Sequence, residues 1–555
     1  MRLISVFLIA LTLSSCARIA VLKEITPVFQ PDAAVKVDID SHARAFREAS
    51  HLEKTDPWRA GEYYIAALAD LTAKLQKQPD SAGLQQAYNF ALDRMFSLIR
   101  MHNLNPWGTP LRFGKYQFTS DKVPIEGWRP ENFEFLPTDQ VKVGGEYLTA
   151  MAVRPGLGAS LVAIGRKPQP DYRRTFSQPR SYYGVSAIAR FRGNVCTVSF
   201  HDPMDDETIS LGQRRFTLSA DYTTPLAVLL TRERPEKLGW VRLLDPAKYA
   251  ETARISRLRP YDPDRIPLLL VHGLVDTPAT WVPMVNQLRA DPLVRKHFQI
   301  WVFSYPSGYP YPYSAALLRK ELDRMKEVYP RHKPIVVVGH SMGGMISRLL
   351  VTDSRDRLWD AYFHQPPEAI RMSEREKQLM LDMLIFKARP EIARAIFIAA
   401  PHRGSRLAAT FPARLARRLV RVPQMMVELG DAIRQVVTLS EGGMAYEDLP
   451  TSIDSLTTTN TFIKTVDSLP IHPRIPYHSI MGDRGKPAAR LNPELGTDTF
   501  VPYTSSHLPG AVSELIIPSD HSAHQHPEGI AEVRRILLLH AGKAGPSNAP
   551  QAAIP

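Results

Sequence analysis

Residues 336–350, VVVGHSMGGMISRLL, join an apolar run to a helical pattern through a short glycine-rich turn. The residues before Gly339 are typical of a buried strand, and those after Ser341 have the apolar spacing of a helix. Gly339 and Gly343 flank Ser341 and allow neighbouring backbone to approach it without side-chain collision. Three interpretations fit this junction: a nucleophilic serine on a strained turn, a phosphate-binding loop, or a structural link.

The chain around this junction repeats a strand followed by a helix. Continuous apolar strands that alternate with helices predict a mostly parallel sheet covered on both faces, an α/β fold. We expect this domain to cover residues 261–545, with insertions at about 353–390 and 403–470. The predicted strands lie within 266–273, 299–308, 333–340, 394–405, 476–483 and 513–520, and the last helix covers 527–540.

The strand-to-helix context favours a nucleophile at Ser341. A phosphate loop needs a longer glycine spacing and a lysine beside its serine or threonine, and the segment has neither. A sharp turn at the end of a strand lifts the serine hydroxyl above the sheet, near the positive end of the next helix. A serine hydroxyl also needs a base and an orienting acid, and in this architecture both follow in the chain, the acid first.

Three histidines follow the last predicted strand, in PSDHSAHQHPEGIAEV (518–533). His521 comes soonest after the strand and is the first candidate for the base, with His524 second. His526 is expected to cap or flank the last helix. The alternative is a zinc site, because imidazole is a common zinc ligand. We predict no metal and no cofactor, because a serine and an acid are also present.

Two aspartates compete for the acid. Asp483, in IMGDRG, directly follows a predicted strand, whereas Asp498, in GTDTFVPYTSS, lies in a loop. Asp520 is adjacent to His521, and neighbouring residues rarely orient each other's side chains correctly. The residues alone leave Asp498 and Asp483 both open.

The oxyanion of an acyl-transfer intermediate needs backbone donors. We expect one from the amide of Met342, which follows the nucleophile. The other is expected from the turn in VHGLVD (271–276), where the amide of Leu274, or that of Gly273, would face the site.

The C-terminal half of the chain resembles the α/β-hydrolase superfamily, and within it bacterial lipases and esterases. The resemblance is carried by His272-Gly273, the segment GHSMGG (339–344), APHRGS (400–405), Asp498 with Val501-Pro502, and His521. It implies a Ser341–His521–Asp498 triad and favours Asp498 over Asp483. It also implies a serine hydrolase that cleaves carboxylic, lipid-like acyl esters. Amide cleavage or acyl transfer by the same triad, and a non-catalytic envelope scaffold, are the alternatives.

The insertion after APHRGS occupies the position of a lipase lid. Within it, four apolar residues fall on one helical face with three arginines beside it, which suits either a lipid interface or packing on the domain. These residues are Phe411, Leu415, Leu419 and Val422, and Arg414, Arg417 and Arg421.

The N-terminal half has a different pattern. Residues 16–110 are predicted to be helical, and residues 111–260 to form a β-rich domain whose last strands could extend the neighbouring sheet. The expected strands include EYLTAMAV (146–153) and PLAVLLTR (225–232). The tail at 546–555 is predicted to be disordered.

The first 16 residues predict export and lipid anchoring. A basic Met1-Arg2, a short apolar core and Leu13-Ser14-Ser15-Cys16 match a secretory signal, too short for a spanning helix. The ending resembles the bacterial lipobox, which implies a lipidated Cys16, membrane attachment and a signal peptide at 1–15. Ala17 in place of aspartate implies the outer membrane of the cell envelope.

The two cysteines and the net charge say little about function. With Cys16 lipidated, Cys196 has no partner for a disulfide within the chain and is expected to be buried in a strand. A net charge of +13 suits a solvated surface or anionic lipid headgroups. Nucleic acid is not an expected partner of an exported lipoprotein, and protein partners are not indicated.

Overall fold

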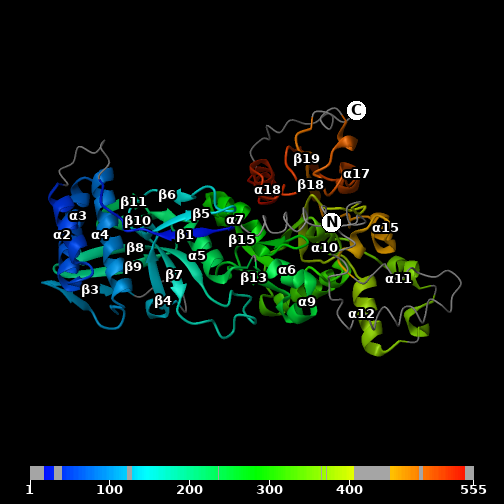
Figure 1. Cartoon of the computed structure of the whole chain (residues 1–555), viewed down its shortest axis with the longest axis horizontal. Helices are drawn as coiled ribbons and strands as arrows, with labels where there is room; N and C mark the ends of the chain where they lie inside the picture. The colour runs from blue at the N-terminus through cyan, green and yellow to red at the C-terminus, as the bar shows by residue number, and fades with distance from the viewer. Residues whose placement is uncertain are drawn as a thin grey trace, which may run out of the picture. The chain divides into compact units, whose positions relative to one another are not determined.

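A computed structural model describes residues 18–30, 40–121, 128–235, 237–363, 365–370, 372–405, 451–486 and 492–543 (Figure 1). The signal peptide with Cys16, the lid-like helix and the tail at 546–555 lie outside these residues. The described residues form two compact units. The N-terminal unit contains residues up to Tyr172 and Gln178–Glu233, and the C-terminal unit contains Arg173–Ser177 and the residues from Arg234 on. In the described chain no helix combines the length and apolar character of a membrane span.

The C-terminal unit is built on a seven-stranded sheet in the order β13-β15-β14-β16-β17-β18-β19. All neighbours pair in parallel except β13, which is antiparallel to β15 at the edge. The predicted α/β sheet is therefore confirmed. The strands are β13 (Arg254–Arg257), β14 (Ile266–Val271), β15 (Phe298–Ser304), β16 (Ile335–His340), β17 (Ile392–Ile398), β18 (Tyr477–Gly482) and β19 (Ser513–Ile517).

Helices cover both faces of this sheet. Leu269 and Val271 belong to the core that α9, α10 and α12 share, whereas the alternating Leu268 and Leu270 are buried outside that core. Helices α7, α8 and α18 contact one another as a separate group. The helices are α7 (Val282–Ala290), α8 (Pro292–His297), α9 (Tyr311–Val328), α10 (Met342–Arg348), α11 (Arg357–Tyr362), α12 (Glu374–Leu384), α15 (Thr461–Asp467), α17 (Tyr503–Ser506) and α18 (Pro527–His540).

The C-terminal unit begins earlier than residue 261. It includes α6 (Lys237–Leu244) and the edge strand β13, which extends the sheet as the sequence suggested. It also includes Arg173–Ser177, where Phe176 packs against Trp301 and Tyr329 and its carbonyl accepts a 2.7 Å hydrogen bond from the Arg257 amide. A short segment that is distant in sequence from the rest of the C-terminal unit thus completes its core.

In the N-terminal unit, three helices and a six-stranded sheet share one core. The predicted boundary at 110/111 therefore does not separate two domains. Cys196 is fully buried in this core, as predicted, and burial raises the pKa of its thiol. The elements are α2 (Asp40–Leu52), α3 (Pro57–Lys77) and α4 (Ala82–Met101), with β2 (Leu111–Phe113), β3 (Tyr116–Ser120), β4 (Phe133–Pro137), β7 (Ala159–Gly165), β8 (Tyr182–Arg192) and β9 (Val195–His201).

Two predicted strands are wrong. Residues 225–232 lie in helix α5 (Thr224–Glu233). The Asp221 carboxylate accepts hydrogen bonds from the amides of Thr223 and Thr224, where this helix begins. Of 146–153, only Val153 enters a strand. The short strand pairs are β1 (Val21–Glu24) with β5 (Val141–Gly144), β6 (Val153–Arg154) with β12 (Ala220–Asp221), and β10 (Thr208–Leu211) with β11 (Arg214–Thr217).

Helix α4 completes the hydrogen bonding of β8 beyond the point where β7 ends. The last β7 partner of β8 is Ala159, opposite Ala187. Two residues further on, the buried Tyr88 hydroxyl donates to the Ala189 carbonyl at 2.7 Å and accepts from the Ala189 amide at 2.8 Å. One phenol therefore satisfies two buried backbone groups.

We expect Tyr88→Phe to lower the free energy of unfolding by about 2 kcal/mol, because a buried amide and carbonyl lose their partner. Urea denaturation of the full chain, with hydrogen exchange followed on β8 peptides, measures this. Tyr63→Phe on α3 is the control, since the Tyr63 hydroxyl makes no hydrogen bond to any described residue. Equal stability of the two variants would contradict the assignment.

Candidate active site

Ser341 lies between β16 and α10 in a strained backbone conformation, with φ +52° and ψ −123°. Two glycines make this turn possible. A Cβ on Gly343 would lie 2.2 Å from the Val271 carbonyl oxygen, and one on Gly339 would lie 2.4 Å from the Gly343 carbonyl oxygen. The elbow is therefore packed backbone against backbone on the end of β14.

The structure brings Ser341, His521 and Asp498 together. His521 Nε2 lies 2.8 Å from Ser341 Oγ, and His521 Nδ1 lies 2.7 Å from Asp498 Oδ2. Asp498 is 2% exposed, and its other oxygen accepts hydrogen bonds from the amides of Phe500 (2.8 Å) and Val501 (2.7 Å). This arrangement orients the imidazole so that Nε2 faces the serine hydroxyl.

The competing acid and base lie elsewhere. The Asp483 carboxylate accepts a 2.7 Å hydrogen bond from the Gly485 amide and so closes its own turn. His524 Nε2 lies 2.7 Å from Thr280 Oγ1, and burial lowers the pKa of this histidine well below its ordinary value. His526 caps α18 and Asp520 accepts from the Ser522 amide. The three histidines after β19 therefore do not converge on one metal.

The turn that carries Leu274 lies against the serine. A Cβ added to Gly273 would meet Ser341 Cβ and His340 Nδ1, each at 3.2 Å. Val275, the residue after Leu274, has a φ of +65°, which is unusual for a β-branched side chain. Its amide donates to Ser307 Oγ at 3.1 Å. Met342 is the first residue of α10. Both expected oxyanion donors thus belong to segments that flank Ser341.

His272 contacts the carbonyl of Gly273 in this turn. It is fully buried, stacks on Tyr305 with ring centroids 4.3 Å apart, and Nδ1 lies 2.9 Å from the Gly273 carbonyl. Burial lowers the pKa of His272 to about 4, so the imidazole is neutral. We infer that His272 stabilises the turn at Gly273 and is not a catalytic base.

Comparison with known proteins agrees with this geometry. Residues 268–533 match the profile of the alpha/beta hydrolase family, and this range contains Ser341, Asp498 and His521. The C-terminal unit has the alpha/beta-hydrolase fold and is called the hydrolase unit below. A search of curated proteins found no match.

Solved structures similar to part of this chain include a lipase and two esterases. Mature lipase BlEst2 of Bacillus licheniformis is 17% identical over 51% of this chain and 97% of its own, with a TM-score of 0.31. A metagenomic carboxyl esterase is 19% identical over 48% and 68%, with a TM-score of 0.26. Esterase RhEst1 of a Rhodococcus species is 13% identical over 51% and 93%, with a TM-score of 0.27.

The APHRGS segment of the hydrolase unit clamps the loop that carries Asp498. Ser405 Oγ donates to the Phe500 carbonyl at 2.5 Å. Arg403 Nη1 donates to the carbonyls of Thr504 (2.7 Å) and His507 (2.8 Å). The resemblance marked this segment, but the sequence did not show which loop it holds.

A second feature that the sequence did not reveal joins the elbow to the base. His340 Nε2 donates to the His521 carbonyl at 2.8 Å, so the residue before the nucleophile holds the backbone of the base. Its Nδ1 lies 3.7 Å from Asp276, and ligand atoms of Asp276, His340 and His524 lie within 4.8 Å of one another. The centroids of the His340 and His524 rings lie 3.8 Å apart, with the ring planes tilted by 30°.

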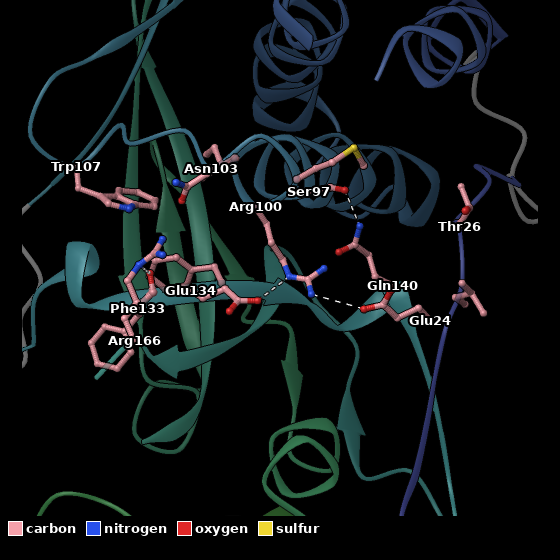
Figure 2. Close-up of a pocket in the computed structure, with 14 residues that line it drawn as sticks. Glu24, Thr26, Ser97, Arg100, Asn103, Trp107, Phe133, Glu134, Gln140 and Arg166 are labelled. Carbon is pink, nitrogen blue, oxygen red and sulfur yellow. Dashed lines mark hydrogen bonds and ion pairs between the residues drawn. The ribbon is translucent and has the colours of Figure 1, made fainter. Parts of the chain in front are cut away.

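The N-terminal unit contains a cavity of about 590 Å³ beside the end of α4 (Figure 2). Arg100 lies 2.8 Å from Glu134 and 3.6 Å from Glu24, and Gln140 donates to Ser97 at 2.5 Å. The described residues that line the cavity include no histidine.

We expect Ser405→Ala to loosen the acid loop without unfolding it, because the Ser405 amide keeps its 2.9 Å bond to the Leu456 carbonyl. Hydrogen exchange at the amides of Phe500 and Val501, which contact Asp498, should become faster. Ser519→Ala is the control, since that hydroxyl donates to the neighbouring Asp520 carbonyl. Unchanged exchange in Ser405→Ala would show that the clamp does not hold the loop.

Proposed function

We propose that the hydrolase unit is a serine hydrolase that cleaves carboxylic esters through an acyl-enzyme. The observation that carries the proposal is the continuous hydrogen-bond chain from Asp498 through His521 to Ser341. A hydroxyl is a weak nucleophile at neutral pH, and a neutral imidazole within hydrogen-bond reach is what activates it.

In the first half of the reaction, His521 Nε2 takes the proton of Ser341 as Oγ attacks the ester carbonyl carbon. The negative charge on the carbonyl oxygen is stabilised by the amides of Met342 and Leu274. His521 then gives the proton to the alcohol oxygen, the ester C–O bond breaks, and the acyl group remains on Ser341. In the second half, water replaces the alcohol and the same steps release the acid.

Asp498 acts through His521. Its Oδ2 accepts a hydrogen bond from Nδ1–H, so that Nε2 is the nitrogen that can accept the serine proton, and the carboxylate stabilises the imidazolium that forms. Because Oδ1 is already bound to two amides, the carboxylate cannot turn away from the imidazole. Its fixed orientation supports Asp498, and not Asp483, as the acid.

We also propose a lipid-like acyl substrate and attachment to the outer membrane of a bacterial envelope through lipidated Cys16. The lipobox-like ending at Cys16 supports attachment, and an enzyme held at a membrane meets its substrates there. The insertion at 403–470, in the position of a lipase lid, is a further reason to expect an apolar acyl chain.

We expect Ser341→Ala and His521→Gln to lower kcat for p-nitrophenyl esters by three or more orders of magnitude, as roughly 10⁴-fold losses are typical of triads. Asp498→Asn should cost far more activity than Asp483→Asn, which is the matched control. Labelling of the wild type with a fluorophosphonate should disappear in Ser341→Ala.

Three outcomes would overturn this function. Failure of the folded wild type to react with a fluorophosphonate would favour a non-catalytic scaffold. Labelling that survives Ser341→Ala would place the nucleophile elsewhere. Faster cleavage of anilides than of matched esters would make the protein an amidase.

We expect Cys16→Ser to abolish palmitate incorporation and to leave an uncleaved or mis-sorted precursor. Metabolic labelling with palmitate, followed by membrane fractionation, checks this. Ser15→Ala, which keeps a small residue before the cysteine, is the control. Normal labelling of Cys16→Ser would contradict lipid attachment at that residue.

A further inference from the structure

Phe500 is an exposed aromatic residue beside the proposed base. Its side chain is 54% exposed, although large apolar side chains are usually buried. Its ring centroid lies 5.1 Å from that of His521, with the planes 39° apart. An apolar ring thus faces solvent at the edge of the catalytic imidazole.

The backbone that carries this ring is held at both of its polar groups. The Phe500 amide donates to Asp498 Oδ1 at 2.8 Å, and the Phe500 carbonyl accepts from Ser405 Oγ at 2.5 Å. The preceding residue, Thr499, has a φ of +100°, and its amide donates to Thr497 Oγ1 at 3.2 Å. Both backbone polar groups of Phe500 therefore have partners, and the contacts that hold the acid also hold the backbone from which the ring extends.

The chemistry of ester cleavage tells which part of a substrate would meet this ring. The imidazole that takes the serine proton gives it to the alcohol oxygen, so the alcohol part must lie on the His521 side of the carbonyl carbon. The acyl part is bonded to the other side of that carbon. A ring packed on His521 therefore lies next to the alcohol part, not the acyl chain.

We propose that Phe500 is a specificity-determining residue that packs against the alcohol part of the ester. The hydrolase then favours esters of bulky apolar alcohols, such as aryl-methyl or cycloalkyl-methyl alcohols, over ethyl or glyceryl esters. This inference rests on the proposed ester hydrolysis and adds the alcohol class to it. Burial of the ring against an apolar alcohol removes apolar surface of both partners from water.

An alternative role for Phe500 would be to cover His521 and so protect the imidazole from water. That role predicts the same loss of kcat/KM for every ester when the ring is removed, together with a changed pH profile. Contact with the alcohol predicts a loss that grows with the apolar size of the alcohol. The two are separated by varying the alcohol alone.

The experiment compares butyrate esters of ethanol, glycerol, cyclohexylmethanol and benzyl alcohol, which keep the acyl group constant. Wild type, Phe500→Leu and Phe500→Ala are measured with each ester. Val512→Ala is the matched control: Val512 is 58% exposed, but its amide bonds to the Tyr477 carbonyl at the start of β18, the opposite end of the strand from the site.

We expect Phe500→Ala to lower kcat/KM for the two bulky esters about 10-fold or more, chiefly through KM, and to change the ethyl ester less than about 2-fold. Phe500→Leu should recover part of the loss, and Val512→Ala should match the wild type. Equal losses on all four esters, or a wild type that prefers the ethyl or glyceryl ester, would overturn the inference while ester hydrolysis stands. Absence of both ester cleavage and fluorophosphonate labelling in the wild type would overturn the proposed function and, with it, this inference.

Discussion

The site depends on a close backbone contact between two neighbouring strands and a helix. Gly343 lies so near the carbonyls of Val271 and His272 that no side chain fits between them, and this contact holds Ser341 at a positive φ. A residue in such a conformation typically costs about 1–3 kcal/mol, which the packed core of the sheet offsets. The same contact brings the end of β14, with the turn at Gly273, beside the serine. One packing constraint thus sets the nucleophile and the expected oxyanion turn together.

The other two groups of the triad are held by different parts of the unit. His521 is attached to the elbow itself, because His340 donates to its carbonyl. Asp498 is held from the other side by the segment that contains Arg403 and Ser405. The base is thus tied to the elbow and the acid to the APHRGS segment, and the 2.7 Å contact between His521 Nδ1 and Asp498 Oδ2 joins the two.

The sequence predicted best where burial imposes a simple pattern. The central strands β14 and β16 are nearly continuous apolar runs because they are buried on both faces, and the predicted last helix has the ends of α18. The nucleophile turn at Ser341 could be predicted because glycines are required there.

The choice between Asp498 and Asp483 depends on the path of polar loops, which have no periodicity, and only the resemblance favoured Asp498. Helix α5 replaces the predicted strand at 225–232, because a short apolar run fits either structure and the local hydrogen bonds of Asp221 have no periodic signature. The division at 110/111 failed because a shared core between helices and sheet leaves no mark on local sequence.

The five residues Arg173–Ser177 have a consequence for dissection of the protein. They interrupt the sequence of the N-terminal unit, yet they complete the core around Trp301 and Tyr329. Cutting the polypeptide once, at Arg234, would leave that patch of aromatic surface uncovered in the released C-terminal piece. A fragment that is to keep the complete core of the C-terminal unit must therefore include Arg173–Ser177 as well as the residues from Arg234 on.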